Sequence, residues 1–125
     1  MRTILALLLL AAPAYADVSI DDNQQTVTVD CAKDPNVNVT GNEATVTLTG
    51  TCEKVQLTGN RAKVTGSTKV IYVPGNDNVA TLDAVDQIGT PGNKNKVTYK
   101  KTVDAKLKKP KISNPGNKNA IAKAK

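Results

Sequence analysis

The chain has 125 residues, which suits one domain, and its 17 basic and 11 acidic residues give a formal net charge of +6. Histidine, phenylalanine and tryptophan are absent. This composition excludes a core of bulky aromatic side chains, and it removes the commonest general base and transition-metal ligand. The apolar residues are mainly Val, Ile, Leu and Ala, which suit thin, stacked β-layers.

Residues 1–16 are typical of a secretory signal peptide. An unbroken apolar run covers residues 4–12, and Ala16 ends an Ala-x-Ala cleavage motif. The run is too short for a membrane-spanning helix, which needs roughly 20 residues. Asp17, rather than a cysteine, follows the predicted cut, which disfavours a lipid anchor. We therefore expect an exported protein, periplasmic or secreted, that comprises residues 17–125.

Six copies of one short pattern follow. They start at Val18, Val37, Val55, Ile71, Ile88 and Ile112, which are 19, 18, 16, 17 and 24 residues apart. A period of this size is typical of stacked repeats. The third position is apolar in four copies, whereas Thr90 and Asn114 occupy it in the last two. Apolar residues at alternate positions, before and after a central turn, predict two short β-strands per copy.

An asparagine stands at the sixth position, in the turn, in every copy. This column consists of Asn23, Asn42, Asn60, Asn76, Asn93 and Asn117. The fifth position is Asp22 in the first copy and glycine in the others, and we expect these glycines to supply a positive φ. Stacked asparagine amides can donate to and accept from the copies above and below. The sequence thus predicts an all-β fold, a short parallel β-solenoid of about six coils with an asparagine ladder in the turns.

The two cysteines are Cys31, late in the first copy, and Cys52, late in the second. In an oxidising compartment an isolated pair forms a disulfide, and adjacent coils would bring these residues together. Closing a loop of about 20 residues would stabilise the fold by roughly 3 kcal/mol in the chain-entropy model. A catalytic thiol is disfavoured because no histidine can activate it, and two cysteines alone do not form a zinc site.

Charge is divided along the chain. Residues 17–93 contain five basic and ten acidic residues, a net of −5, whereas residues 94–125 contain eleven lysines and one aspartate, a net of +10. Six lysines lie in an insertion before the last copy: Lys100, Lys101, Lys106, Lys108, Lys109 and Lys111. Because so many lysines cannot face a narrow interior, we expect residues 100–111 to form an exposed loop, and residues from about 120 to 125 to fray.

The lysine-rich insertion has two interpretations. It could bind an anionic envelope polymer through counterion release. It could instead act as a solubilising loop and protect the edge of an exposed sheet. No aromatic residues interleave with these lysines for base stacking, so we expect no sequence-specific binding of nucleic acid.

Two further sequence patterns resemble known binding sites. An outward threonine column resembles the ladders of ice-binding solenoids, although lysines interrupt its companion column and threonine is a good exposed strand residue. It consists of Thr28, Thr47, Thr65, Thr81 and Thr98. Residues 75–86 resemble a fragment of calcium-binding nonapeptide repeats, with Asp77, Asp83 and Asp86 as ligands, but only one turn carries an aspartate. Solvated carboxylates are the alternative there. The acidic residues are scattered rather than paired, so we expect no catalytic site and no cofactor.

The Gly-Asn turns between valine-rich strands carry a family resemblance. Residues 39–60, VTGNEATVTLTGTCEKVQLTGN, and residues 73–83, VPGNDNVATLD, are similar to the bacterial domain-of-unknown-function family 3060. The resemblance covers most of residues 18–119 and departs from the family in the lysine-rich last third. It implies an exported or envelope protein with a repetitive β architecture and no established activity, and it carries over no catalytic residue.

These observations predict a non-catalytic, exported β-repeat protein. We expect an envelope or extracellular binding or scaffold module with a basic C-terminal face, whose partner is an anionic envelope polymer or a protein. The alternative is a structural subunit that associates with itself by stacking through open coil edges, with its acidic front against the basic back of the next copy.

Overall fold

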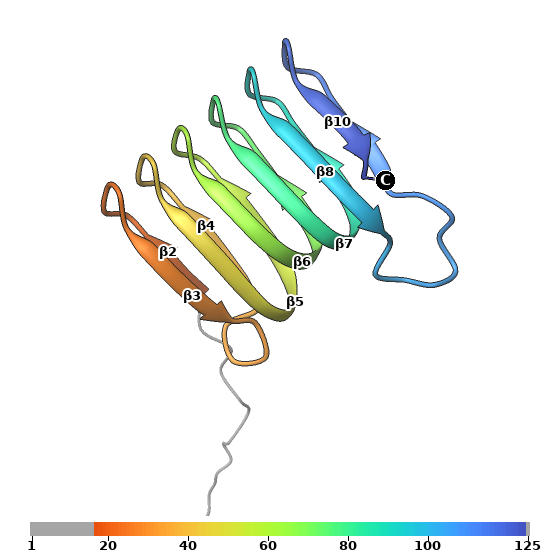
Figure 1. The fold of residues 1–125 in the computed structure, drawn as a ribbon, viewed down its shortest axis with the longest axis horizontal. Coiled ribbons are helices and arrows are strands. Elements are labelled where there is room, and N and C mark those ends of the chain that lie inside the picture. Colours follow the sequence, from red (N-terminus) through yellow and green to blue (C-terminus); the bar gives the residue numbers. More distant parts are fainter. Residues whose placement is uncertain (1–16, 125) are drawn as a thin grey trace, which may run out of the picture.

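The computed structural model describes residues 17–124, so the predicted signal peptide lies outside the described residues. These residues form one sheet of nine parallel strands, wound into a β-solenoid of about five turns (Figure 1). The strands are β2 (Asp17–Ile20), β3 (Thr26–Asp30), β4 (Asn36–Val39), β5 (Thr45–Leu57), β6 (Lys63–Tyr72), β7 (Val79–Gly89), β8 (Lys96–Lys101), β9 (Lys111–Ser113) and β10 (Ala120–Lys123). The predicted all-β solenoid is confirmed. The six copies correspond to about five turns, and β9 and β10 are the last strands within the described residues.

The strand registers confirm the columns read from the repeats. The first face of the rod carries the strands that precede the turns, and on it Val18, Val37, Val55, Ile71, Ile88 and Ile112 stand in register. The second face carries the strands that follow the turns, and on it Val27, Val46, Val64, Ala80, Val97 and Ile121 stand in register. In the middle coils the chain bends round a third side without leaving the sheet, so β5, β6 and β7 each serve both faces.

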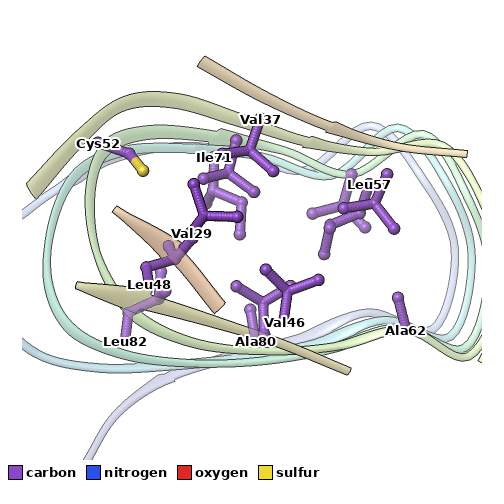
Figure 2. Packing of buried hydrophobic residues seen from close by; sticks show 14 of the residues in the cluster. Val29, Val37, Val46, Leu48, Cys52, Leu57, Ala62, Ile71, Ala80 and Leu82 are labelled. Carbon is purple, nitrogen blue, oxygen red and sulfur yellow. The ribbon is translucent and has the colours of Figure 1, made fainter. Parts of the chain in front are cut away.

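The apolar columns fill the space between the two faces. Figure 2 shows Val37 and Ile71 pointing inward from one face and Val46 and Ala80 from the other. Ile71 and Val46 are fully buried, as is Leu57 near the turn end of the interior. Alternate strand residues point outward into solvent, as the side-chain period of two requires. Fully burying a Val, Ile or Leu side chain contributes about 1.5–3 kcal/mol, so these columns supply the main stabilisation of the rod.

The third side holds the disulfide. Cys31 and Cys52 are bonded, with their Cα atoms 4.8 Å apart, which confirms the predicted pair. Cys52 stands in register with Thr68, and Thr68 with Val85, and all three are fully buried. The Thr68 hydroxyl donates to a backbone carbonyl at 2.9 Å, so this buried polar group is satisfied.

The C-terminal end differs from the prediction. Residues 120–123 were expected to fray, but they form β10, which pairs with β8 from Ala120–Lys96 to Lys123–Tyr99. Pairing with β8 gives this segment backbone hydrogen bonds, and Ile121 packs against the core. The lysine-rich insertion is likewise shorter than expected, because β8 runs to Lys101 and β9 begins at Lys111.

Candidate functional site

The turn asparagines form a continuous outer ladder. At each step the backbone N–H of one asparagine donates to the side-chain Oδ1 of the asparagine in the preceding coil, at 2.9–3.0 Å. The steps join Asn23, Asn42, Asn60, Asn76, Asn93 and Asn117 in order. The predicted ladder is present, but it consists mainly of bonds from backbone to side chain rather than from amide to amide. Asn60 also donates through its own Nδ2 to Asn42, at 3.3 Å.

The residue after each asparagine, and not the glycine before it, has the left-handed backbone. φ lies between 56° and 61° at Gln24, Glu43, Arg61, Asp77, Lys94 and Lys118. This conformation directs the backbone N–H to the asparagine carbonyl of the next coil, as in the 2.8 Å bond from Glu43 to Asn60. The expectation that the turn glycines supply a positive φ was therefore wrong.

Close contact between coils explains the turn glycines instead. A Cβ on Gly59, Gly75, Gly92 or Gly116 would overlap the carbonyl oxygen of the glycine in the preceding coil. At the glycine position of the turn, the backbone of each coil packs directly on the backbone of the preceding coil. A side chain fits at this position only in the first coil, which has no coil before it within the described residues.

A second asparagine ladder, which the sequence analysis missed, lies inside the last three turns. Asn78 and Asn95 are each 1% exposed. Asn78 Oδ1 accepts from the Ala62 N–H at 2.8 Å, and its Nδ2 donates to the Gly59 carbonyl at 3.0 Å. Asn95 and Asn119 repeat both bonds one and two coils later. The available signal was the Asn-x-Asn spacing in GNDN and in the two GNKN turns.

Polar residues also replace apolar ones at the end of the interior. The Thr90 hydroxyl donates to Asn114 Oδ1 at 2.9 Å, and Asn119 Nδ2 donates to the same Oδ1 at 2.9 Å. This network accounts for the loss of apolar character at the third position of the last two copies.

The segment between β8 and β9 projects as a loop beside the last coil (Figure 1). The six candidate polyanion-binding lysines lie in this loop and at the adjoining ends of the two strands. Lys100 and Lys101 end β8, Lys111 begins β9, and the other three lie in the loop between them. All six are exposed. Lys100 Nζ lies 3.6 Å from Asp83 Oδ1, while the other five lysines form no ion pair within residues 17–124.

The loop has a defined shape because hydrogen bonds hold it to the rod. Asp86 Oδ1, on β7, accepts from the backbone N–H of Val103 at 2.7 Å and of Asp104 at 2.9 Å. Asp104 Oδ1 in turn accepts from the N–H of Lys106 at 2.9 Å. The Thr102 hydroxyl lies 2.9 Å from two loop carbonyls. The loop lysines are therefore displayed on an anchored turn of chain.

The structure does not bring the candidate calcium ligands together. Asp86 is occupied by the loop amides, Asp83 lies beside Lys100, and Asp77 is in a turn. Residues 17–124 contain no group of three or more His, Cys, Asp or Glu side chains placed to hold a metal. The threonine column does stand in register on the second face, with Lys63 and Lys96 in the column beside it.

Two surface groups have shifted pKa values. Hydrogen bonds from the hydroxyls of Ser19 and Thr40, both at 2.6 Å, lower the pKa of the Asp21 carboxyl below its usual value. Glu53, 2.9 Å from Lys69, raises the pKa of that lysine. The Ser19 bond lies within the first coil, whereas the Thr40–Asp21 and Lys69–Glu53 contacts join neighbouring coils, and all are exposed.

Comparison with known families identifies the family of the chain. The model described as "Protein of unknown function (DUF3060)" matches residues 39–69 and residues 60–118, which together make up more than half of the chain. The chain belongs to this family. The matched part of this DUF3060 protein includes the lysine-rich insertion and the last turn, so both lie within the family region. The family description names no activity, and no curated protein or solved structure matches the chain.

One feature of the described residues bears on compartment. The Cys31–Cys52 disulfide is typical of an oxidising environment such as the extracellular space. Within residues 17–124, no helix has the length and apolar character needed to cross a membrane.

Proposed function

We propose that the protein is an exported, non-catalytic module that binds an anionic envelope or extracellular polymer through its lysine-rich segment, residues 100–111. The observation that carries this proposal is the anchored loop. Exposed lysines that lack acidic partners in the described chain stand on a turn held by Asp86. The disulfide supports export, because such bonds persist mainly in oxidising compartments.

The charge distribution favours binding at one end of the rod. The last third of the chain has a net charge of +10 and the rest of residues 17–125 a net charge of −5. An anionic polymer is therefore attracted to the C-terminal end and repelled by the first coils. The binding would be electrostatic and would tolerate variation in the polymer's sequence of sugars or phosphates.

The proposal predicts how strongly the binding affinity depends on the salt concentration. If about five lysines each release one condensed counterion, the affinity should fall by roughly 10²- to 10³-fold between 50 and 200 mM salt. Binding through shape or hydrogen bonds alone would change far less over the same range.

The test is co-sedimentation of the exported protein with isolated envelopes at low and high salt. A loop variant changes the six candidate lysines to Gln: Lys100, Lys101, Lys106, Lys108, Lys109 and Lys111. A matched control changes six exposed lysines elsewhere to Gln, which alters the net charge equally: Lys33, Lys54, Lys63, Lys69, Lys94 and Lys96.

We expect salt-sensitive binding that the control retains and the loop variant loses. Equal losses in both variants would mean that net charge alone drives the association. If the unmodified protein does not sediment with envelopes at low salt, the proposal is wrong, and the lysines act in solubility or edge protection.

A further inference from the structure

Both ends of the rod present sheet edges that have no partner within residues 17–124. The outer edges belong to β2 and β3 in the first coil and to β9 and β10 in the last. An unpaired strand edge is a template for another strand. A second copy could therefore place its first coil on the last coil of the first copy and continue the solenoid head to tail.

Much of the geometry favours such stacking. Asp17 and Lys111 are the first and last members of one register column, so stacked copies would bring these opposite charges together. The outer ladder could also continue. The Asn117 N–H donates to Asn93 Oδ1 in the preceding coil, and the Asn23 N–H of a second copy could donate in the same way to Asn117 Oδ1 of the first. These features alone predict polymerisation.

One position in the first coil opposes it. In every later coil the fifth position of the repeat is glycine, because the Cα atom there faces a carbonyl oxygen of the preceding coil. The first coil has Asp22 there, and the Asp22 carbonyl is the one that Gly41 faces. In a continued stack Gly116 would precede Asp22, and the Asp22 Cβ would overlap the Gly116 carbonyl oxygen just as a Cβ on Gly116 would overlap that of Gly92.

We propose that Asp22 is a stop residue that keeps the protein from polymerising end to end. Its Cβ blocks the close backbone contact that stacking requires, because that contact leaves no room for a side chain at this position. The last coil remains able to accept a coil that has glycine at this position. The self-stacking alternative is thus closed to this chain by a single side chain.

The test compares the mass of the exported protein and its variants over a wide range of concentration, by light scattering after size exclusion and by sedimentation velocity. The unmodified protein should remain monomeric. Asp22→Gly should form linear oligomers whose mass grows with concentration, and electron microscopy should show rods of constant width. Asp22→Ala, which keeps the Cβ, and Asp22→Asn, which keeps it without the charge, should both remain monomeric.

Two controls separate stacking from misfolding and from charge loss. Asp21→Gly removes the adjacent negative charge but leaves Asp22, so it should stay monomeric. The double variant Asp21→Thr/Asp22→Gly recreates the Thr-Gly-Asn turn that folds in the second and third coils, and it should polymerise as Asp22→Gly does.

Mixing provides a directional readout. Unmodified protein can accept an Asp22→Gly copy on its last coil, but its own first coil cannot be placed on another copy. Adding it should therefore shorten the Asp22→Gly oligomers. The proposal is overturned if the unmodified protein polymerises, if both glycine variants stay monomeric, or if Asp22→Ala polymerises as readily as Asp22→Gly.

Discussion

The carboxylate of Asp86, on β7, accepts a 2.7 Å hydrogen bond from the backbone N–H of Val103, in the loop that displays the lysines. A second bond, from Asp104 N–H at 2.9 Å, reaches the same oxygen. The lysine-rich segment is inserted between β8 and β9, and both of these strands pair with β7. The Asp86 side chain on β7 therefore holds the inserted segment against the strand that its two flanking strands share.

Asp86→Ala should loosen this loop and leave the rod folded. Hydrogen bonds to a charged group contribute about 1.5–3 kcal/mol when buried, and this partly exposed pair should contribute about 1 kcal/mol. Trypsin should cleave after the loop lysines faster in Asp86→Ala, at an unchanged circular dichroism spectrum. Asp83→Ala, which removes only an exposed contact with Lys100, serves as control and should be cleaved at the original rate.

Gly59→Ala should destabilise the protein, whereas Arg61→Gly, two residues later in the same turn, should not. Gly59→Ala places a Cβ against the Gly41 carbonyl and should lower the free energy of unfolding by about 1–3 kcal/mol, or more if the coils cannot separate. Arg61, with φ of 56°, occupies a conformation that glycine adopts at lower cost. Arg61→Gly should therefore be neutral or stabilising by up to about 1 kcal/mol. Urea denaturation measures both, and a destabilised Arg61→Gly would contradict this account of the turn.

The repeats were sufficient to predict the fold because register leaves little freedom in a narrow solenoid. A slip of one residue would turn a whole interior column to the solvent. Val37 therefore pairs with Val55, and Val46 with Val64, as the sequence columns predict. The disulfide followed from the same alignment, since each cysteine lies late in its copy.

The turn chemistry could not be predicted in the same way. Glycine and asparagine both favour turns, and the local sequence does not reveal that the glycine column is set by contact with the preceding coil. The inner ladder was missed because one asparagine per turn already explained the repeat, although Asn78 carries the buried bonds. The role of Asp86 was out of reach because the loop has no periodicity from which its path could be read.

Loss of the disulfide should destabilise the rod. Cys31 and Cys52 are 21 residues apart, and a cross-link of that span contributes roughly 3 kcal/mol in the chain-entropy model. The double variant Cys31→Ser/Cys52→Ser should shift the urea midpoint downward by a corresponding amount. Adding reductant should lower the midpoint of the unmodified protein and leave that of the double variant unchanged. An unchanged midpoint in the reduced protein would show that the first coil contributes little to the cooperative fold.

Lowering the pH should remove the contribution of Asp21 to the free energy of unfolding. Hydroxyl donors from Ser19 and Thr40 lower the pKa of this carboxyl below 3.8 in the folded protein. As the pH falls, the Asp21 carboxylate of the unfolded state is therefore protonated before that of the folded state. The contribution of Asp21 to the free energy of unfolding is present above pH 3.8 and is lost as the pH falls through the lower pKa of the folded state. Asp21→Asn should flatten this part of the curve of unfolding midpoint against pH. Asp22→Asn, which changes the neighbouring exposed aspartate of the same coil, is the control for general charge effects.

The second, inner asparagine ladder, formed by Asn78, Asn95 and Asn119, should stabilise the protein further when it is extended and destabilise it when it is interrupted. Asn78→Ala leaves the Ala62 N–H and the Gly59 carbonyl without their side-chain partners in a buried turn, and it should cost about 1–3 kcal/mol. Ala62 occupies the equivalent position one coil earlier, so Ala62→Asn should extend the ladder toward Ala44 and Gly41 and raise the free energy of unfolding by about 1 kcal/mol. Urea denaturation of both variants, beside the outer-ladder variant Asn60→Ala, measures the contrast. Because Asn60 is exposed, its loss should cost less than that of Asn78, and the reverse order would show that the outer ladder is the principal stabiliser of the turns.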